Sequence, residues 1–332
     1  MSRVVRLDSG ATAVPMPVFV EDWAATYGSP YMVQAEDPVT ADAELVEDGE
    51  QFVAHPGAPL APGGRVAFVD GVRRGEASLY QFDSGTGAVV RGVAGGHACG
   101  AVIADDRATF FGETRVRRLV IWGSGRSGAL PAVDGGWSWT SASIASTTPD
   151  APLKELQTRM REEEGRLAEA LGEQGDLVVI DGPLNFVRSR DLPVVGYVKT
   201  HYRALLNEEH HRRIPELGAG ERSSLFRLGG DRYSCYLRLT EGGASSSPWF
   251  GIVRLEIPQS PGLKAAVEVA DRVAGTIPRF AGVAHRDPRA PQNLQPIGAL
   301  ERHLRHLLGQ AGLATRAVRE AVHALAVEEV TP

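Results

Sequence analysis

RVAFVD, at Arg65–Asp70, is an apolar run that ends in an aspartate and is followed at once by Gly71. This pattern predicts a buried strand with an acidic tip. LVVID, at Leu177–Asp181, repeats the pattern, because it also ends in Asp and is followed by Gly. Two such strands can lie side by side in one sheet, and their aspartates then meet at one edge.

Further strand-like runs follow the first one, and short turns rich in Gly and Asp separate them, which indicates an antiparallel meander. These runs are Ala77–Phe82, Ala98–Ile103 and Val116–Trp122. The next segment, Gly123–Thr148, is low in charge and rich in Gly, Ser and Thr, so we expect a long loop. Its Trp137 and Trp139 could stack nucleobases, but packing the loop onto the core is the favoured role.

From Pro152 to Leu171 the apolar residues take the spacing of an amphipathic helix. The apolar stripe consists of Leu153, Leu156, Met160, Leu167 and Leu171. Later strands are expected at Val194–Thr200, Tyr233–Thr240 and Trp249–Ile257, and later helices at Gly262–Gly275, Ile297–Leu308 and Ala314–Ala326. Residues 1–64 lack such periodicity, so we expect an irregular N-terminal segment followed by one mixed α/β domain at 65–330.

Three consecutive glutamates interrupt the stripe of the predicted helix. Four residues beyond Met160 lies Glu164, and Leu167 follows three residues later. Glu164 is therefore predicted to face the sheet, with Glu163 as a competitor on nearly the same face.

A carboxylate buried beside two others is strongly unfavourable unless a cation neutralises it. Asp70, Glu164 and Asp181 offer only oxygen ligands, which favours Mn²⁺ or Mg²⁺. The pattern thus predicts a metal site. The competing interpretation is that both Asp-Gly pairs are ordinary turns and that the glutamates lie on a solvated helix face.

Antiparallel strands with an Asp on the first, then a helix bearing Glu, then a strand ending in Asp, are typical of RNase H-like nucleases. Several phrases resemble motifs of the NurA family of DNA-end-processing nucleases. FVDGVRR at Phe68–Arg74 resembles its first motif, and VVIDGPL at Val178–Leu184 resembles its third. GYVKT at Gly196–Thr200 resembles the lysine-bearing strand, and PIGALERH at Pro296–His303 resembles the C-terminal motif. The helix bearing Glu164 lies at a suitable distance before the third motif.

The resemblance runs from about residue 65 to 310 and has two departures. Val72 stands where the first motif usually has Ser, and Arg302 stands where a small residue commonly precedes the histidine. It implies an RNase H-like mixed sheet flanked by helices, with additional strands and C-terminal helices.

The resemblance also implies roles for two residues that spacing alone does not single out. His303 would complete the metal site as a ligand or donate a proton to the leaving oxygen. Lys199 would contact the scissile or an adjacent phosphate. Lysine is scarce here, since only three of the 35 basic residues are lysines, and this adds weight to Lys199.

The expected function is that of a metal-dependent deoxyribonuclease acting at DNA ends, in end resection or phage defence. The resemblance implies a homodimer that works with a hexameric HerA-type ATPase. The sequence lacks a P-loop motif, which agrees with a motor supplied by another chain. The alternative is a catalytically inert RNase H-like module that binds nucleic acid or scaffolds a complex.

The overall composition is compatible with this expectation. A net charge of −6 argues against a protein that coats nucleic acid nonspecifically, but a metal site needs carboxylates. Cys99 and Cys235 lie far apart without metal-ligand spacing, so we expect two buried thiols in a reducing compartment. No apolar run is long enough to span a membrane and the N-terminus lacks a signal-peptide pattern, so a cytoplasmic location is expected.

Overall fold

A computed structural model describes residues 43–82, 87–189, 191–201 and 203–328. Its centre is a mixed sheet in which three antiparallel strands are followed by two parallel ones, in the order β4-β3-β2-β6-β7. These strands are β2 (Val66–Phe82), β3 (Val89–Ala104), β4 (Thr109–Trp122), β6 (Leu177–Asp181) and β7 (Val194–Val198). β6 runs parallel to β2, and β7 runs parallel to β6. The expected mixed α/β fold, a large mixed sheet flanked by helices, is thus confirmed.

More strands extend the sheet on both sides. Beyond β7 the order continues β11-β10-β8-β1, β9 pairs with β10, and β5 lies beside β4. Their bounds are β1 (Ala54–Pro56), β5 (Thr140–Ser143), β8 (Glu221–Ser223), β9 (Phe226–Leu228), β10 (Arg232–Arg238) and β11 (Ile252–Pro258).

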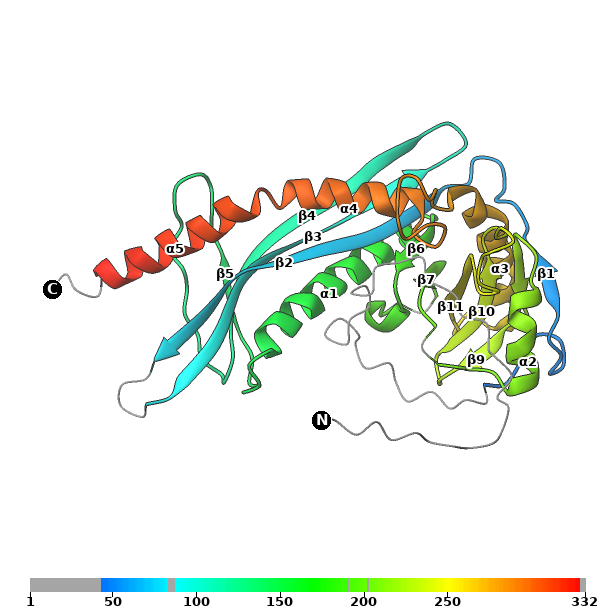
Figure 1. The fold of residues 1–332 in the computed structure, drawn as a ribbon, viewed down its shortest axis with the longest axis horizontal. Helices are drawn as coiled ribbons and strands as arrows, with labels where there is room; N and C mark the ends of the chain where they lie inside the picture. The colour runs from blue at the N-terminus through cyan, green and yellow to red at the C-terminus, as the bar shows by residue number, and fades with distance from the viewer. Residues whose placement is uncertain (1–42, 83–86, 190, 202, 329–332) are drawn as a thin grey trace, which may run out of the picture.

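Helices cover both faces of the central sheet (Figure 1). α1 (Ala151–Glu173) packs on one face and α4 (Gln295–Leu307) on the other. α3 (Leu263–Thr276) packs against the added strands β8, β10 and β11. α5 (Ala311–Glu328) continues beyond α4 along the long strands β2, β3 and β4 (Figure 1). The shorter helices are α2 (Glu208–Arg213), η1 (Leu184–Phe186), η2 (Ile214–Glu216) and η3 (Ile277–Phe280). In the part of the chain that the structure describes, no helix is both long and apolar enough for a membrane crossing.

The first strand corrects the expectation of a strand stopped at Gly71. β2 is one strand of 17 residues that includes both Arg65–Asp70 (from Val66 onward) and the separately predicted Ala77–Phe82. It continues because β3 pairs with it along its whole length, with Gly71 opposite Cys99. Asp70 therefore lies inside a long strand. The antiparallel meander itself is confirmed.

The helix and the loop that precedes it differ from expectation in detail. Leu153 is 40% exposed, so it does not belong to the buried stripe of α1 that holds Leu156 and Met160. The predicted loop Gly123–Thr148 contains β5, which pairs in parallel with the end of β4. Trp139 is buried, and the guanidinium of Arg118 lies 4.4 Å from the ring centre of Trp137. The loop thus packs down through its tryptophans, as favoured above.

Residues 43–64 are anchored to the sheet, although the sequence shows little periodicity there. β1 pairs with β8, and Leu45 and Phe52 are buried beside Phe226. Residues 1–42 lie outside the described part of the chain. The domain boundary at residue 65 stays a prediction.

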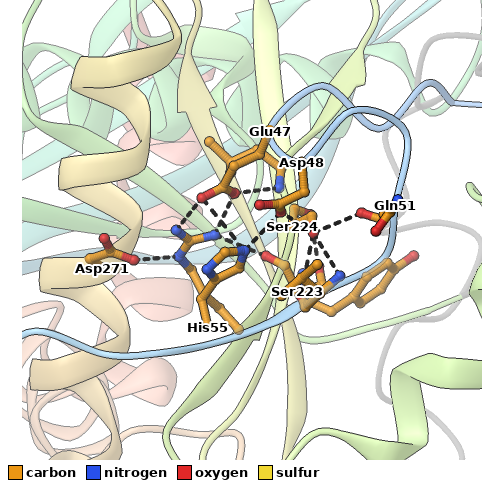
Figure 2. A network of polar contacts seen from close by, with 11 residues as sticks. Glu47, Asp48, Gln51, His55, Ser223, Ser224 and Asp271 are labelled. Carbon is orange, nitrogen blue, oxygen red and sulfur yellow. Dashed lines mark hydrogen bonds and ion pairs between the residues drawn. The ribbon is translucent and has the colours of Figure 1, made fainter.

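A network of charges holds this segment in place (Figure 2). Both carboxylate oxygens of Glu47 accept hydrogen bonds of 2.7 Å from the buried guanidinium of Arg222, which also donates to Asp271. Asp48 accepts from the hydroxyl of Ser224 at 2.6 Å and lies 2.8 Å from the ring of His55. Because its members already bond to one another, this network is a structural anchor.

The two cysteines are as expected. Both Cys99 and Cys235 are free and buried, and burial raises the pKa of each thiol to about 12. They therefore stay protonated at neutral pH.

Candidate metal centre

Asp70 and Asp181 lie next to each other on adjacent parallel strands. The pairing of β2 with β6 ends at Val69 opposite Ile180, and the two aspartates are the next residues in register. Side chains alternate between the faces of a strand, so Asp70 shares its face with Phe68, which packs in the core beneath α4. The sheet thus brings together the two aspartates predicted to meet.

A third carboxylate, which the sequence analysis did not single out, joins them from α4. One carboxylate oxygen each of Asp70, Asp181 and Glu301 lie within 4.8 Å of one another. Glu301 is 6% exposed and sits beside the buried Leu300 and Leu304. A glutamate four residues after the buried Ile297 breaks an apolar stripe in the same way as Glu164, so the same signal could have found it.

His303 points elsewhere. Its ring stacks on Phe111, with the ring centres 4.2 Å apart and an angle of 15° between the planes. Residues two positions apart in a helix are rotated by about 200° about its axis, so Glu301 and His303 point to different sides of α4. Among the described residues, the group of three carboxylates does not include His303. Its role as a ligand or proton donor stays a prediction.

Glu164 approaches from α1 on the opposite face of the sheet. Its side chain is fully buried; Oε2 accepts a hydrogen bond of 2.8 Å from Arg161, and Oε1 has no partner within the described chain. A Cβ at residue 71 would lie 2.3 Å from that Oε1, so the glycine leaves room for the carboxylate where it lies. Gly71 therefore admits Glu164 to the strand that carries Asp70.

The other two glutamates of the triplet have partners of their own. Glu163 accepts hydrogen bonds from Arg115 at 3.1 Å and from Arg166 at 2.9 Å. Glu162 accepts one from Arg166 at 3.1 Å. The geometry thus favours Glu164 over Glu163 as the glutamate of this site.

Lys199 lies at the centre of the polar contacts. Its ammonium donates to Asp181 Oδ2 at 2.7 Å and to Asn293 Oδ1 at 2.8 Å, and its side chain is buried. Arg161 also reaches this edge, since it donates to the backbone carbonyl of Asp181 at 2.6 Å. Two cations therefore border the carboxylates.

These cations do not neutralise Asp70. Burial, followed by the negative charges of Asp181, Glu164 and Glu301, raises the pKa of Asp70 well above its ordinary value, and Lys199 only partly opposes this. Burial likewise raises the pKa of Glu164 despite the neighbouring Arg161. Within the described residues, no group donates a hydrogen bond to the Asp70 carboxylate.

Glu301 behaves differently. Burial by itself would raise the pKa of Glu301, but two hydrogen bonds from Arg289 and the charge of Lys199 bring it below its ordinary value. Asp70 is thus a buried carboxylate without a hydrogen-bond donor in the described chain, and it lies beside the ionised Glu301. This combination fits a divalent cation that prefers oxygen ligands, such as Mn²⁺ or Mg²⁺.

This geometry predicts different effects for substitutions of the three glutamates of α1. We expect Glu164→Gln to weaken the binding of Mn²⁺ at least about tenfold, because outer-shell changes at metal sites cost roughly 10–100-fold in metal affinity. Glu162→Gln should be neutral, since it loses only an exposed ion pair. Glu163→Gln should lie near the Glu162 variant. The measurement is the dissociation constant of Mn²⁺ by isothermal titration calorimetry, and equal small effects from all three variants would show that the triplet is an ordinary helix face.

Comparisons with known proteins give only distant likenesses. No protein-family model matches the sequence, and a search of curated proteins finds no significant match. Among solved structures, the chain is similar to the NurA nuclease from Sulfolobus solfataricus, with 10% identity and a TM-score of 0.44 over 83% of this chain and 88% of that one. It is also similar to the catalytic domain of human endonuclease V, with 20% identity and a TM-score of 0.35 over 74% of this chain and 85% of that one.

Proposed function

We propose that this chain is a nuclease that hydrolyses phosphodiester bonds with the help of a divalent metal ion, Mn²⁺ or Mg²⁺. The observation that supports this most is the group formed by Asp70, Asp181 and Glu301, whose oxygens lie within 4.8 Å of one another. The fully buried Glu164 beside them keeps one oxygen without a partner in the described chain. Such clusters are costly without a cation.

In this proposal Asp70, Asp181 and Glu301 hold the metal, and Glu164 adds negative charge from the other face. The metal would supply an activated water and stabilise charge on the phosphoryl group. Lys199 holds Asp181 in place through a bond of 2.7 Å and places a positive charge where a phosphate oxygen could bind. Arg161 fixes Glu164 and the end of β6 together.

We further propose that the substrate is DNA and that the chain acts at DNA ends as a NurA-like enzyme. The motif resemblance from Phe68–Arg74 to Pro296–His303 supports this. The same resemblance supports a homodimer that works with a HerA-type hexameric ATPase in end resection or phage defence.

The test is hydrolysis of end-labelled linear DNA, single- and double-stranded, by the purified protein. We expect cleavage with Mn²⁺ or Mg²⁺ and none when EDTA is in excess. Binding of the DNA without cleavage under every metal condition would instead support the catalytically inert module.

A further inference from the structure

A cavity of about 410 Å³ lies between the β3–β4 hairpin and the N-terminal half of α4. The mechanism proposed above gives it no role. Its size is that of a small-molecule site. The lining residues that matter here are Phe111, Phe280, Arg286, Asn293 and Arg302.

Aromatic rings form one part of the lining. Phe111 on β4 is 47% exposed, although large apolar side chains are usually buried. The ring of His303 stacks on Phe111 and holds it in place. Phe280 packs edge-to-face on Phe68, with the ring centres 4.9 Å apart. Exposed rings held in place by neighbours are suitable platforms for stacking a planar ligand.

Two arginines give the cavity positive charge. Arg286 and Arg302 are exposed, and neither side chain has an ion pair or hydrogen bond with any residue that the structure describes. Arg289 nearby differs, because Asp287 and Glu301 already bind it. Free guanidinium groups beside an acidic cluster are suited to binding phosphate, which the carboxylates alone would repel. Arg302 is also one of the two departures from the NurA-like motif.

Hydrogen bonds connect the cavity wall to the carboxylates. Asn293, which lines the cavity, donates to Asp287 at 2.6 Å and accepts from Lys199 at 2.8 Å. Lys199 in turn donates to Asp181 at 2.7 Å. One side chain, Lys199, thus stands between the cavity and the proposed metal site.

We propose that this cavity binds one unpaired nucleotide of a single-stranded segment next to the scissile phosphate. Its base stacks on Phe111, and its phosphate binds Arg286 and Arg302. A base in a duplex cannot stack in this way, so the site selects frayed ends or single strands. This inference rests on the proposed nuclease function, whose substrate it specifies.

The test compares two single-stranded probes of equal charge. One is a fluorescein-labelled oligothymidylate about 12 residues long, and the other is a base-free chain of the same length. Binding is measured by fluorescence anisotropy with EDTA present, in an Asp70→Asn background, so that no cleavage interferes. Hydrolysis by the parent protein is measured separately, which distinguishes failure of this inference from failure of the nuclease function.

We expect Phe111→Ala to weaken binding of oligothymidylate by roughly 5- to 100-fold, the range for losing one base–aromatic stack, and to leave binding of the base-free probe unchanged. Arg302→Ala should weaken both probes equally. Phe82→Ala, on a side chain 65% exposed at the far end of β2, and Arg319→Ala on α5 are the matched controls and should change neither.

Phe111→Leu, which keeps an apolar side chain but removes the aromatic ring, is the second variant, and far-UV circular dichroism checks the fold of each. If neither Phe variant changes the ratio of the two affinities, or if both weaken the two probes equally, the cavity does not bind a base. If the base-dependent binding is present but the parent protein never cleaves DNA, the nucleotide site stands and the nuclease function fails.

Discussion

Asp70→Asn is expected to lower the rate of DNA hydrolysis at least about 10³-fold, because loss of a metal ligand removes several kcal/mol of transition-state stabilisation. The fold should remain intact, since Asn has nearly the same shape and no described residue depends on the Asp70 carboxylate for a hydrogen bond. Rates measured at saturating Mn²⁺ on end-labelled DNA test this. Asp181→Asn should behave in the same way.

In the absence of metal, Asp70→Asn should make the folded protein more stable. The pKa of Asp70 in the folded protein lies well above its ordinary value of 3.8, because of burial and the neighbouring carboxylates. Between these two values the folded protein binds more protons than the unfolded chain, so stability falls as pH rises through this window. The melting temperature of Asp70→Asn in EDTA should therefore exceed that of the parent protein at neutral pH, and the difference should shrink as pH falls toward 4.

The control is Asp134→Asn, which changes an exposed aspartate in the segment before β5 and should alter neither rate nor melting temperature. More than a tenth of the parent activity remaining in Asp70→Asn would show that this residue is not a metal ligand. Added Mn²⁺ should raise the melting temperature of the parent protein more than that of the variant.

The second large effect is expected at Glu301, and it is compared with the effect of changing His303. The variants are Glu301→Gln and His303→Ala. Glu301 belongs to the same group of three carboxylates as Asp70, and Arg289 holds it in its ionised form. Its replacement should raise the half-saturating Mn²⁺ concentration and lower the rate at least about 100-fold, more than an outer-shell change. His303→Ala loses a stacking contact with Phe111, and we expect a change in rate of less than about fivefold.

The family resemblance makes the opposite prediction for His303. As a ligand, its loss would raise the Mn²⁺ requirement, and as a proton donor it would flatten the pH–rate profile between about 6 and 8. His306→Ala is the matched control, on an exposed histidine one turn later. Either effect in His303→Ala but not in His306→Ala would contradict the assignment of Glu301 in place of His303.

Much of the fold was predictable because apolar periodicity is a local signal. Leu177–Asp181 was predicted with its observed bounds, and the stripe that points Glu164 at the sheet needs only the 3.6-residue repeat. The neighbouring positions of Asp70 and Asp181 followed from two similar strand patterns.

The parts that were missed depend on partners far away in the sequence. Gly71 indicates a strand end locally, but pairing with β3 overrides it, and the glycine instead makes room for Glu164. The sequence motif at Pro296–His303 points to His303, whereas only the packing of α4 shows that Glu301 is the residue that faces Asp70. The anchor formed by Glu47 and Arg222 joins residues 175 positions apart, which no local pattern reveals.

The central claim is that Asp70, Asp181 and Glu301 bind one divalent metal ion. Crystals of the protein grown with Mn²⁺ and measured at the manganese absorption edge test it most directly. We predict an anomalous peak with a carboxylate oxygen of each residue at about 2.1–2.2 Å, and no such peak in Asp70→Asn crystals. Crystals in which Mn²⁺ binds elsewhere, while these three carboxylates stay without a metal, would contradict it.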